Sequence, residues 1–591
     1  MNMADRIAAL IDFVERERNA ALELDAANSI LSDTALVNMG YAIDGLWVVK
    51  DEDDIAIFKC QNNESRFRPG DQLLFSCTDK RSFWGVLTKV LNGGRELHCR
   101  VGSKMPAVGS GPWLATENLV SLSNSIIKAL EKLQPGGPGW GLAKRLFKEE
   151  SPVIPGFLPR TEIDSESVYS QLERDSTQSL DNSQLAVFKE CLKMPALIGV
   201  QGPPGTGKTM LLSFVGEGLV RSGKKIVLLA PTHQAINNAL STIKGLFPGR
   251  NVIKVGDELR NESLDPNIPI VFKNKAIEEY PADTIFGMTF MAGLSRLMGV
   301  DRRPIDPNVV IIDEAGQLPL AQGVCAALCG AGSIFLFGDD RQMPPVFTGD
   351  LSDDEYAVSV FAQLRKSHPE SISMLNITHR LNAELCRHIS DAFYPDASEP
   401  LKPSDSARNR YLEIEVKREP DERIRHILEP ANALVWVNVV TDNNAQSNIM
   451  EAGIVSRLIE TCLRFGMSQT EIAVVTPFRR QARMIHNALD KYLENFIDPP
   501  IIDTVERVQG ATVDLVIYSF CASQPDYIAS LANFLFSPNR LNVAISRARR
   551  KAIFVSSPDV FNVLPLEYRG IVGRNSCKTL VAGARRVYLA E

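Results

Sequence analysis

The sequence has few of the features that mark membrane, secreted or zinc-binding proteins. No apolar run approaches the ~18 residues of a membrane span, so we expect no membrane partner. The first residues contain no apolar signal segment, which predicts a cytoplasmic location, or a nuclear one in a eukaryotic host. The ten cysteines form no Cys-x-x-Cys pair. The nearest two, Cys325 and Cys329, are interpreted as core residues of a helix rather than zinc ligands.

Length and charge exclude little. A chain of 591 residues predicts three or four domains. Its 45% hydrophobic and 23% charged residues are ordinary for a globular protein. The net charge of −7 does not argue against nucleic-acid binding, because an acidic protein can carry a local basic groove.

The pattern of apolar, polar and turn residues changes several times along the chain. We expect an N-terminal helical segment (1–40), a small β-barrel (41–122), a helical stalk and linker (123–176), a first α/β domain (177–395), a second α/β domain (396–565) and a C-terminal tail (566–591). The first segment has helical spacing of apolar residues and is interpreted as a solvated surface helix. Short β-rich runs between turns predict a small barrel or sandwich. Alternating strands and helices predict parallel sheets in the last two domains.

One glycine-containing stretch of the sequence fits a known nucleotide-binding motif. Residues 202–209 read Gly-Pro-Pro-Gly-Thr-Gly-Lys-Thr, which fits the phosphate-binding loop, and they stand between an apolar strand and a helix. The candidate nucleotide contacts there are Gly202, Pro203, Gly205, Thr206, Gly207, Lys208 and Thr209. Backbone N–H groups and the helix N-terminus attract phosphate. We expect Lys208 to reach the β- and γ-phosphates of ATP and the Thr209 hydroxyl to bind Mg²⁺.

Carboxylates follow a second apolar strand. Asp313 and Glu314 end the run 308–312, and ligands of parallel sheets bind at the carboxyl ends of strands. Asp313 is therefore a candidate Mg²⁺ ligand, and Glu314 a candidate base for the attacking water. After a third strand, Gln342 is a candidate sensor of the γ-phosphate, and Asp339 could join its network.

Several further motifs follow in a fixed order between residues 180 and 555. They are Asp-Glu-Ala-Gly-Gln (313–317), Gly-Asp-Asp-Arg-Gln-Met-Pro-Pro (338–345), Thr-Pro-Phe-Arg-Arg-Gln (476–481), Val-Gln-Gly (508–510) and Asn-Arg-Leu-Asn-Val-Ala-Ile-Ser-Arg-Ala-Arg (539–549). With the phosphate-binding loop, this set resembles the superfamily 1 helicases, and most closely the 1B branch that contains the nonsense-mediated-decay helicase and senataxin.

The resemblance implies an α/β fold of two tandem RecA-like parallel-sheet domains with ATP in the cleft between them. The N-terminal β-barrel and helical stalk would correspond to the 1B domain of the family. Gln184 would read the adenine edge, and Arg380 and Arg547 would act as arginine fingers on the γ-phosphate, a role that suits a planar guanidinium. Gly510 would contact phosphate or close the cleft.

The resemblance also implies contacts with single-stranded nucleic acid. The candidates are Thr232, His233, Thr289, Pro477, Phe478, Arg479 and Thr504. Hydroxyls and backbone N–H groups at strand ends suit backbone phosphates, which gives a grip independent of sequence. His233 or Phe478 could stack on bases, although Phe478 is as readily interpreted as a packed loop aromatic.

Two residues depart from the family pattern. His379 stands where the family usually has an aromatic residue before the motif IV arginine, and Thr512 stands where it has a glutamate. Both positions contact adenine or ribose in the family. The strictness of the preference for ATP over other nucleoside triphosphates is therefore open.

The sequence thus predicts an ATP- and Mg²⁺-dependent translocase on single-stranded nucleic acid, with 5′→3′ helicase activity. An alternative is an ATP-gated clamp or switch that recruits a partner without separating strands. A P-loop kinase or GTPase is a weaker alternative, because it leaves the motifs from 476 to 549 without a purpose. We expect a monomer and place any nuclease or effector on a separate chain. The choice between DNA and RNA stays open.

Overall fold

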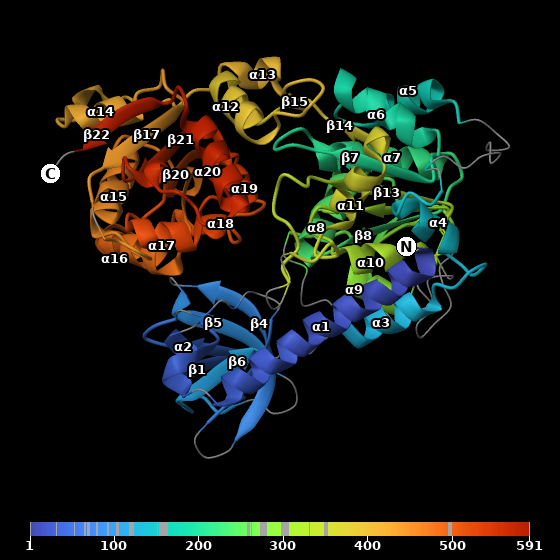
Figure 1. The fold of residues 1–591 in the computed structure, drawn as a ribbon, viewed down its shortest axis with the longest axis horizontal. Coiled ribbons are helices and arrows are strands. Elements are labelled where there is room, and N and C mark those ends of the chain that lie inside the picture. The colour runs from blue at the N-terminus through green and yellow to red at the C-terminus, as the bar shows by residue number, and fades with distance from the viewer. Residues whose placement is uncertain are drawn as a thin grey trace.

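The computed structural model contains a β-barrel and two α/β domains, and a long helix connects the barrel to the first of these domains (Figure 1). The structure describes residues 2–30, 32–38, 40–52, 54–63, 65, 67, 71–77, 81–91, 94–101, 106–117, 123–150, 152, 163–256, 261, 263–271, 280–296, 307–329, 331–347, 351, 353–441, 443–493 and 499–589. Among these residues, no helix has both the length and the apolar character needed to cross a membrane.

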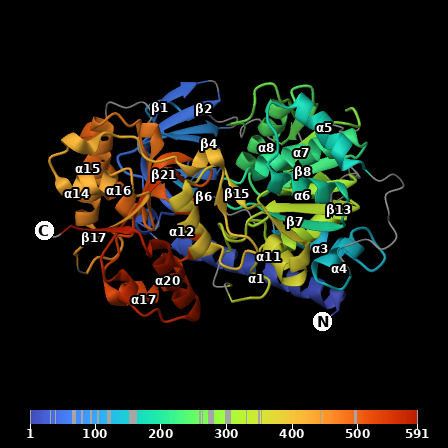
Figure 2. The same cartoon turned by 90° about the horizontal axis from the view of Figure 1, so that it is seen from above.

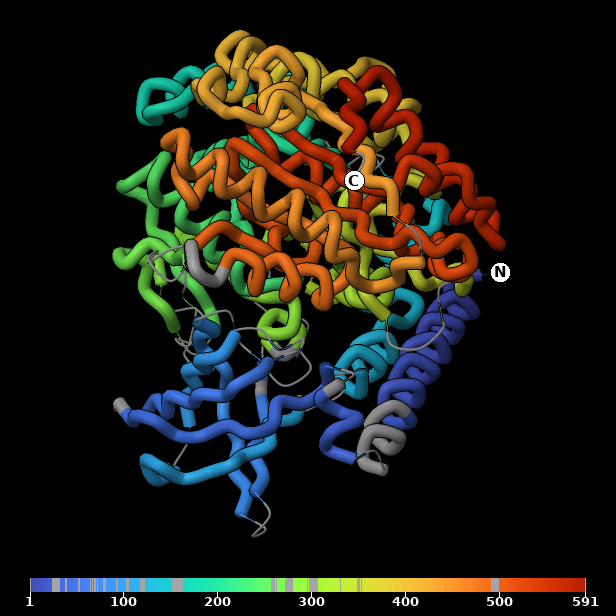
Figure 3. Tube along the Cα trace, turned by 90° about the vertical axis from the view of Figure 1, so that its left-hand side faces the viewer, coloured from blue at the N-terminus to red at the C-terminus, as the bar shows by residue number. Residues whose placement is uncertain are grey.

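The N-terminal helix connects the barrel to the first α/β domain. Helix α1 (Met3–Ile30) runs beside α3 (Ser123–Lys132), and Figure 3 shows the pair beneath the α/β domains. Its apolar face is buried in the core of the first α/β domain, with Leu10 and Phe13 almost fully covered. The expectation of a solvated helix is therefore correct only for the polar face, and the helix is a structural stalk.

The barrel closes through six antiparallel strands in the order β1-β2-β5-β4-β3-β6. The strands are β1 (Ala42–Glu52), β2 (Ile55–Lys59), β3 (Gln72–Ser76), β4 (Ser82–Leu91), β5 (Glu96–Val101) and β6 (Trp113–Glu117), and the short helix α2 (Asp33–Asn38) precedes them. Inward residues alternate with outward ones, as in β5, and stacked phenylalanines fill the interior.

The first α/β domain has a parallel eight-stranded sheet in the order β10-β9-β11-β8-β12-β13-β7-β14. Its strands are β7 (Leu197–Gln201), β8 (Ile226–Ala230), β9 (Val252–Val255), β10 (Ile270–Val271), β11 (Ile285–Thr289), β12 (Val309–Ile312), β13 (Ser333–Gly338) and β14 (Ile372–Met374). Its helices are α4 (Trp140–Leu146), α5 (Ser165–Asp175), α6 (Asn182–Leu192), α7 (Lys208–Arg221), α8 (His233–Leu246), α9 (Phe290–Arg296), α10 (Leu320–Cys325) and α11 (Val360–Ser367). Successive residues of β7 enter the cores on opposite faces of the sheet, which explains the continuous apolar strands.

The second α/β domain has a parallel six-stranded sheet in the order β19-β18-β20-β21-β17-β22. Its strands are β17 (Leu434–Val439), β18 (Ile472–Thr476), β19 (Ile501–Thr504), β20 (Val513–Ser519), β21 (Ala548–Ser556) and β22 (Arg585–Leu589). Its helices are α12 (Ala383–Phe393), α13 (Asp405–Arg408), α14 (Glu422–Leu428), α15 (Ile449–Arg464), α16 (Arg479–Leu493), α17 (Pro525–Ser530), α18 (Ala532–Leu535), α19 (Pro538–Ile545) and α20 (Tyr568–Val581). The two-stranded pair β15 (Ile377–Thr378) and β16 (Lys402–Pro403) lies at the entry to this domain.

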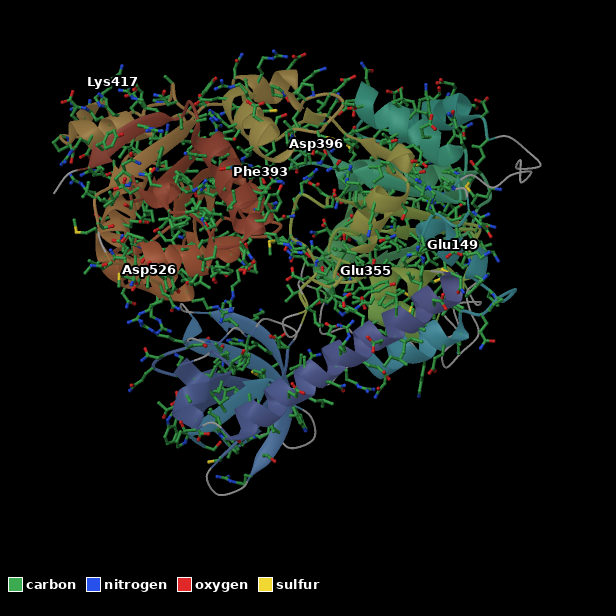
Figure 4. All side chains as sticks on the ribbon, in the orientation of Figure 1. Glu149, Glu355, Phe393, Asp396, Lys417 and Asp526 are labelled. Carbon is green, nitrogen blue, oxygen red and sulfur yellow. The ribbon has the colours of Figure 1, made fainter. Side chains whose placement is uncertain are left out.

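Two domain boundaries differ from the expected ones. Leu381 and Leu385 are buried in the core of the second α/β domain, so the chain crosses over near residue 378 rather than 395 (Figure 2). In Figure 4, Phe393 and Asp396 lie after this crossing, on the side of the second domain that faces the first, and Phe393 is buried in the core of the second domain. Residues 566–589, expected to belong to a C-terminal tail, are part of the second domain, because α20 packs on α12 and β22 pairs with β17.

Candidate active site

The phosphate-binding loop joins β7 to α7 with the geometry that its glycines predict. Gly205 and Gly207 have φ of 74° and 71°, a backbone conformation that is costly for residues with a Cβ. A Cβ at Gly205 would also overlap the Cβ of Arg380. The Thr206 hydroxyl donates to the Pro203 carbonyl at 2.8 Å. The loop is thus pre-shaped, with backbone N–H groups at the start of α7 available for an anion.

Lys208 is held by the two carboxylates at the end of β12. Its Nζ lies 2.8 Å from Glu314 Oε1 and 3.1 Å from Asp313 Oδ1. Burial opposes the charge of Lys208, but attraction to the two carboxylates outweighs it and raises the Lys208 pKa. Burial raises the pKa of Asp313, whereas the proximity of Lys208 overcomes burial and lowers the pKa of Glu314. An incoming triphosphate would therefore compete with Glu314 and Asp313 for the ammonium group.

Glu314 has an unusual backbone conformation. Its φ is 52°, in the left-handed region that residues other than glycine seldom adopt and that is often found at functional sites. Gln317 Nε2 donates to Glu314 Oε2 at 3.1 Å, and Asp313 Oδ1 accepts from the Glu314 N–H at 2.8 Å. Gln317 thus binds one oxygen of the Glu314 carboxylate while Lys208 binds the other, and the side chain lines the cleft.

Asp339 is the centre of a buried network behind the loop. Its carboxylate accepts from Tyr394 Oη at 2.6 Å, Gln342 Nε2 at 2.7 Å and Gln201 Nε2 at 3.0 Å. Burial raises the Asp339 pKa, and the three donors partly offset this effect. Tyr394 belongs to the second domain, and it also accepts from Asn542 Nδ2 at 2.8 Å. The network therefore joins Gln342 to the second domain, and sequence reasoning did not identify Tyr394 or Asn542.

Two arginines of the second domain approach the loop. Arg547 donates to Val543 O at 3.0 Å and to Gln342 Oε1 at 3.5 Å, and burial lowers its pKa to about 10. Arg380 donates to Ser546 O at 3.1 Å. Burial and repulsion from other arginines, Arg547 among them, lower its pKa to about 9. Both groups keep their charge at neutral pH, and mutual repulsion between desolvated cations favours an anion between them.

The residues expected at the adenine form a chain of hydrogen bonds. Gln184 is fully buried, donates to Thr206 O at 2.9 Å and accepts from Asp181 N at 3.0 Å. His379 Nε2 lies 2.9 Å from Asp181 Oδ2. Because both functions of the Gln184 amide are occupied, the residue supports the loop in this structure. Its contact with adenine stays a prediction.

Several of these groups line one cleft of about 1200 Å³ between the two α/β domains. The cleft includes Lys208, Thr209, Glu314, Gln342, Arg380, Gly510 and Arg547. A hydroxyl and a buried carboxylate, Thr209 and Asp313, are hard oxygen donors that suit Mg²⁺, whose remaining ligands would come from water and phosphate. In the described part of the chain no cluster of three or more His, Cys, Asp or Glu side chains has a geometry suited to a metal ion.

The candidate nucleic-acid residues fall into two groups. Thr232 and His233 line the cleft at the start of α8, where the Thr232 hydroxyl caps the helix by accepting from Ala235 N at 3.2 Å. Thr289, Pro477 and Thr504 are buried at or just beyond strand ends, and Arg479 begins α16. The Phe478 ring packs 5.6 Å from Phe534 and 6.1 Å from Tyr527. This packing favours the loop-aromatic interpretation of Phe478 over stacking on a base.

Comparisons with known proteins cover the two α/β domains. Two family models, both described as AAA domain, match residues 179–370 and 356–559. A DNA replication ATP-dependent helicase/nuclease of Arabidopsis thaliana is 27% identical over 404 residues, which are 66% of this chain and 29% of that protein. The DNA polymerase alpha-associated DNA helicase A of Schizosaccharomyces pombe is 26% identical over 430 residues, which are 63% of this chain and 63% of that protein.

The chain spans about a third of the length of the replication helicase/nucleases that it matches. Among solved structures, the arterivirus nonstructural protein 10, a helicase in complex with DNA, is 14% identical with a TM-score of 0.37, over 91% of this chain and 80% of that one.

Proposed function

We propose that this chain is a superfamily 1 helicase that hydrolyses ATP in the cleft between its two α/β domains to move along single-stranded nucleic acid. One observation carries the proposal. The first domain supplies Lys208 and Glu314, which form an ion pair, to the same cleft that receives two arginines from the second domain. Hydrolysis that needs both domains can be coupled to their relative motion.

The residues of the cleft have different roles in ATP hydrolysis. Lys208 leaves its carboxylates to bind the β- and γ-phosphates, which frees Glu314 to orient and deprotonate the attacking water. Mg²⁺, held by Thr209 and Asp313, would neutralise charge on the same phosphates. Arg380 and Arg547 stabilise the charge that develops on the equatorial oxygens in the transition state. Gln342 would report the γ-phosphate to Asp339 and Tyr394, and thus to the second domain.

Movement would follow from the cycle of closure. ATP draws the domains together through the arginines, hydrolysis releases them, and alternating grips on the strand advance the protein by one step. The relatives named as DNA helicases make DNA the first polymer to test. The 5′→3′ direction, the monomeric state, the cytoplasmic location and a separate nuclease or effector chain stay predictions.

Unwinding of a tailed duplex tests this function against the clamp alternative. We expect ATP-dependent release of one strand from a duplex with a 5′ single-stranded tail, and no release by the Lys208→Ala variant, which should still be folded. Tight, ATP-dependent binding of the tailed duplex without strand release or movement along the tail would support the clamp instead.

A further inference from the structure

Large apolar side chains are exposed together where the chain of the second α/β domain enters α20. Leu564, Leu566 and Tyr568 are 68%, 78% and 78% exposed, and Val572 is 43% exposed. Exposed apolar residues are normally scattered singly over a protein surface, whereas a contiguous group marks an interaction site. These four residues are called the apolar patch below. Residues 563–572 are all described by the structure, and none of them lines the ATP cleft.

The loop before α20 folds back against the helix and brings the four residues of the patch together. Pro565 packs on Gly570, where a Cβ would come within 2.8 Å of the Pro565 Cβ. Tyr568 and Val572 are four residues apart on α20, so they lie on one face of the helix. The patch is therefore one continuous surface of loop and helix.

Polar contacts hold this loop in a single conformation. Arg574 Nη1 donates to Val563 O at 2.8 Å. Asn533 Nδ2, on α18, donates to the Glu567 carboxylate. A surface that is already ordered loses little conformational entropy when a partner covers it. The patch is thus prepared for binding.

Acidic side chains border the patch. Glu567 is exposed within the run of patch residues. Across the domain boundary, Asp353 Oδ1 lies 3.3 Å from Arg569 Nη2, and the Asp353 side chain is almost fully exposed. Glu355 is exposed two residues further along the same loop of the first domain, and Figure 4 labels it there. Arg569 is the basic group at this border, and Asp353 already pairs with it.

The charge of this border distinguishes the possible occupants of the patch. Carboxylates repel nucleic acid and anionic membrane surfaces, and a second copy of this chain would bring the same acidic groups to the interface. A segment of another protein that carries positive charge is attracted instead. Positive charges and large apolar side chains occur together on amphipathic helices, whose apolar residues form a stripe along one face.

We propose that the apolar patch is the docking site for a basic amphipathic helix of a partner protein. The leucines and the tyrosine of the patch would cover the apolar stripe of that helix. Glu567, Asp353 and Glu355 would pair with its lysines or arginines. Asp353 belongs to the first domain and the patch to the second, so the partner would contact both, from the side of the molecule on which the stalk helix α1 runs (Figures 2 and 3).

Binding of designed peptides to the full chain tests the proposal. The probe is a fluorescein-labelled helical peptide of about 18 residues, with leucines on one face and lysines on the other. One control peptide has glutamates in place of the lysines, and a second has the leucines spread around the helix. By fluorescence anisotropy, we expect the probe to bind at least about tenfold more tightly than either control. No saturable binding of the probe, or equal binding of the glutamate peptide, would overturn the proposal.

Variants of the full chain locate the bound peptide. Leu566→Ser and Tyr568→Ser should each raise the Kd of the probe at least about tenfold. Tyr588→Ser is the matched control, because it removes an exposed tyrosine of the same domain on β22, and it should leave the Kd unchanged. All three side chains are exposed, so the variants should keep the wild-type melting temperature. Binding that the patch variants do not weaken would place the peptide elsewhere and contradict the proposal.

Two further measurements test the other occupants. Sedimentation velocity of the chain alone at high micromolar concentration should show a monomer, and vesicles of phosphatidylcholine and phosphatidylserine should not bind it. A dimer, or binding to vesicles, that Tyr568→Ser abolishes would assign the patch to a second copy or to a membrane and overturn the proposal. None of these assays needs a nucleotide, so failure of the proposed function would leave the docking site standing.

Discussion

Replacement of Glu314 by glutamine separates the two roles that the structure gives to this carboxylate. Glu314 is the candidate base, and it also holds Lys208 at 2.8 Å in the nucleotide-free cleft. Glutamine has nearly the same shape but cannot accept the proton of water. We therefore expect kcat for ATP hydrolysis to fall by about 10²–10⁴-fold, the usual contribution of general base catalysis.

The same substitution should not weaken nucleotide binding. Before ATP binds, Lys208 must give up its bond with Glu314, and a bond between two charged groups contributes about 1.5–3 kcal/mol. Removal of the negative charge lowers this cost and removes repulsion between Glu314 and the phosphates. We expect the Kd for ATP to stay equal or to fall, by at most about 10–100-fold. The variant should therefore accumulate as a closed, ATP-bound complex.

Single-turnover hydrolysis and equilibrium binding of a fluorescent ATP analogue measure the two effects separately. Glu190→Gln is a suitable control, because Glu190 is an exposed carboxylate of the same domain, paired with Lys193 at 2.6 Å. It should change neither quantity. A Glu314→Gln variant that keeps turnover within tenfold of the wild type, or that binds ATP more weakly, would refute this account of the carboxylate.

Three further outcomes are expected. Arg547→Lys should lower kcat by about 10²–10³-fold with little change in the Kd for ATP, because lysine cannot reproduce the planar set of donors. A hydrolysis rate of this variant equal to that of the wild type at saturating ATP would contradict this expectation. Burial raises the pKa of Glu451 to about 8, so its contribution to stability is complete below its ordinary pKa and is lost as the pH rises through 8. Thermal melts from pH 5 to pH 8.5 should therefore show the wild type losing stability relative to Glu451→Gln, and parallel curves would exclude the shift. Phe13→Ala should destabilise the first domain by about 3–5 kcal/mol, seen as a lower denaturant midpoint, because Phe13 is buried and packs edge-on against Phe347 at 5.4 Å; an unchanged midpoint would show that the stalk contributes little.

Strands with both faces buried could be recognised from the sequence. The expected apolar strand 308–312 coincides with β12 to within one residue, because continuous apolar residues between turn signals leave few other structures. The phosphate-binding loop and Glu314, which follows β12, line one cleft, as expected from the rule that ligands bind at the carboxyl ends of parallel strands.

Short and edge strands were not found for the opposite reason. Strand β22 reads Arg-Arg-Val-Tyr-Leu and buries only Val587, so its composition is that of an exposed tail. Strand β14 has three half-buried residues. The arginines of β22 are typical of edge strands, where charge protects proteins from edge-to-edge association, and they remove the hydrophobic signal on which sequence interpretation depends. Strand β14 is too short to give a recognisable pattern.

The contacts between domains also lay beyond sequence reasoning. Tyr394 reaches Asp339 across 55 positions, and Arg507 reaches Phe67 across 440. Neither contact has a spacing or a local motif, because both depend on how separately folded bodies are arranged. The domain boundary near residue 378 was missed for a related reason: α12 follows the first sheet in the chain but completes the core of the second domain.

ATP hydrolysis in the cleft is expected to be coupled to the binding of single-stranded nucleic acid. Steady-state hydrolysis should be measured without polymer, with single-stranded DNA and with single-stranded RNA of matched length, for the wild type and Lys208→Ala. We expect strong stimulation of the wild type by at least one polymer and no activity of the variant under any condition. A wild-type rate that neither polymer changes would contradict the coupling and favour a clamp controlled by a partner protein.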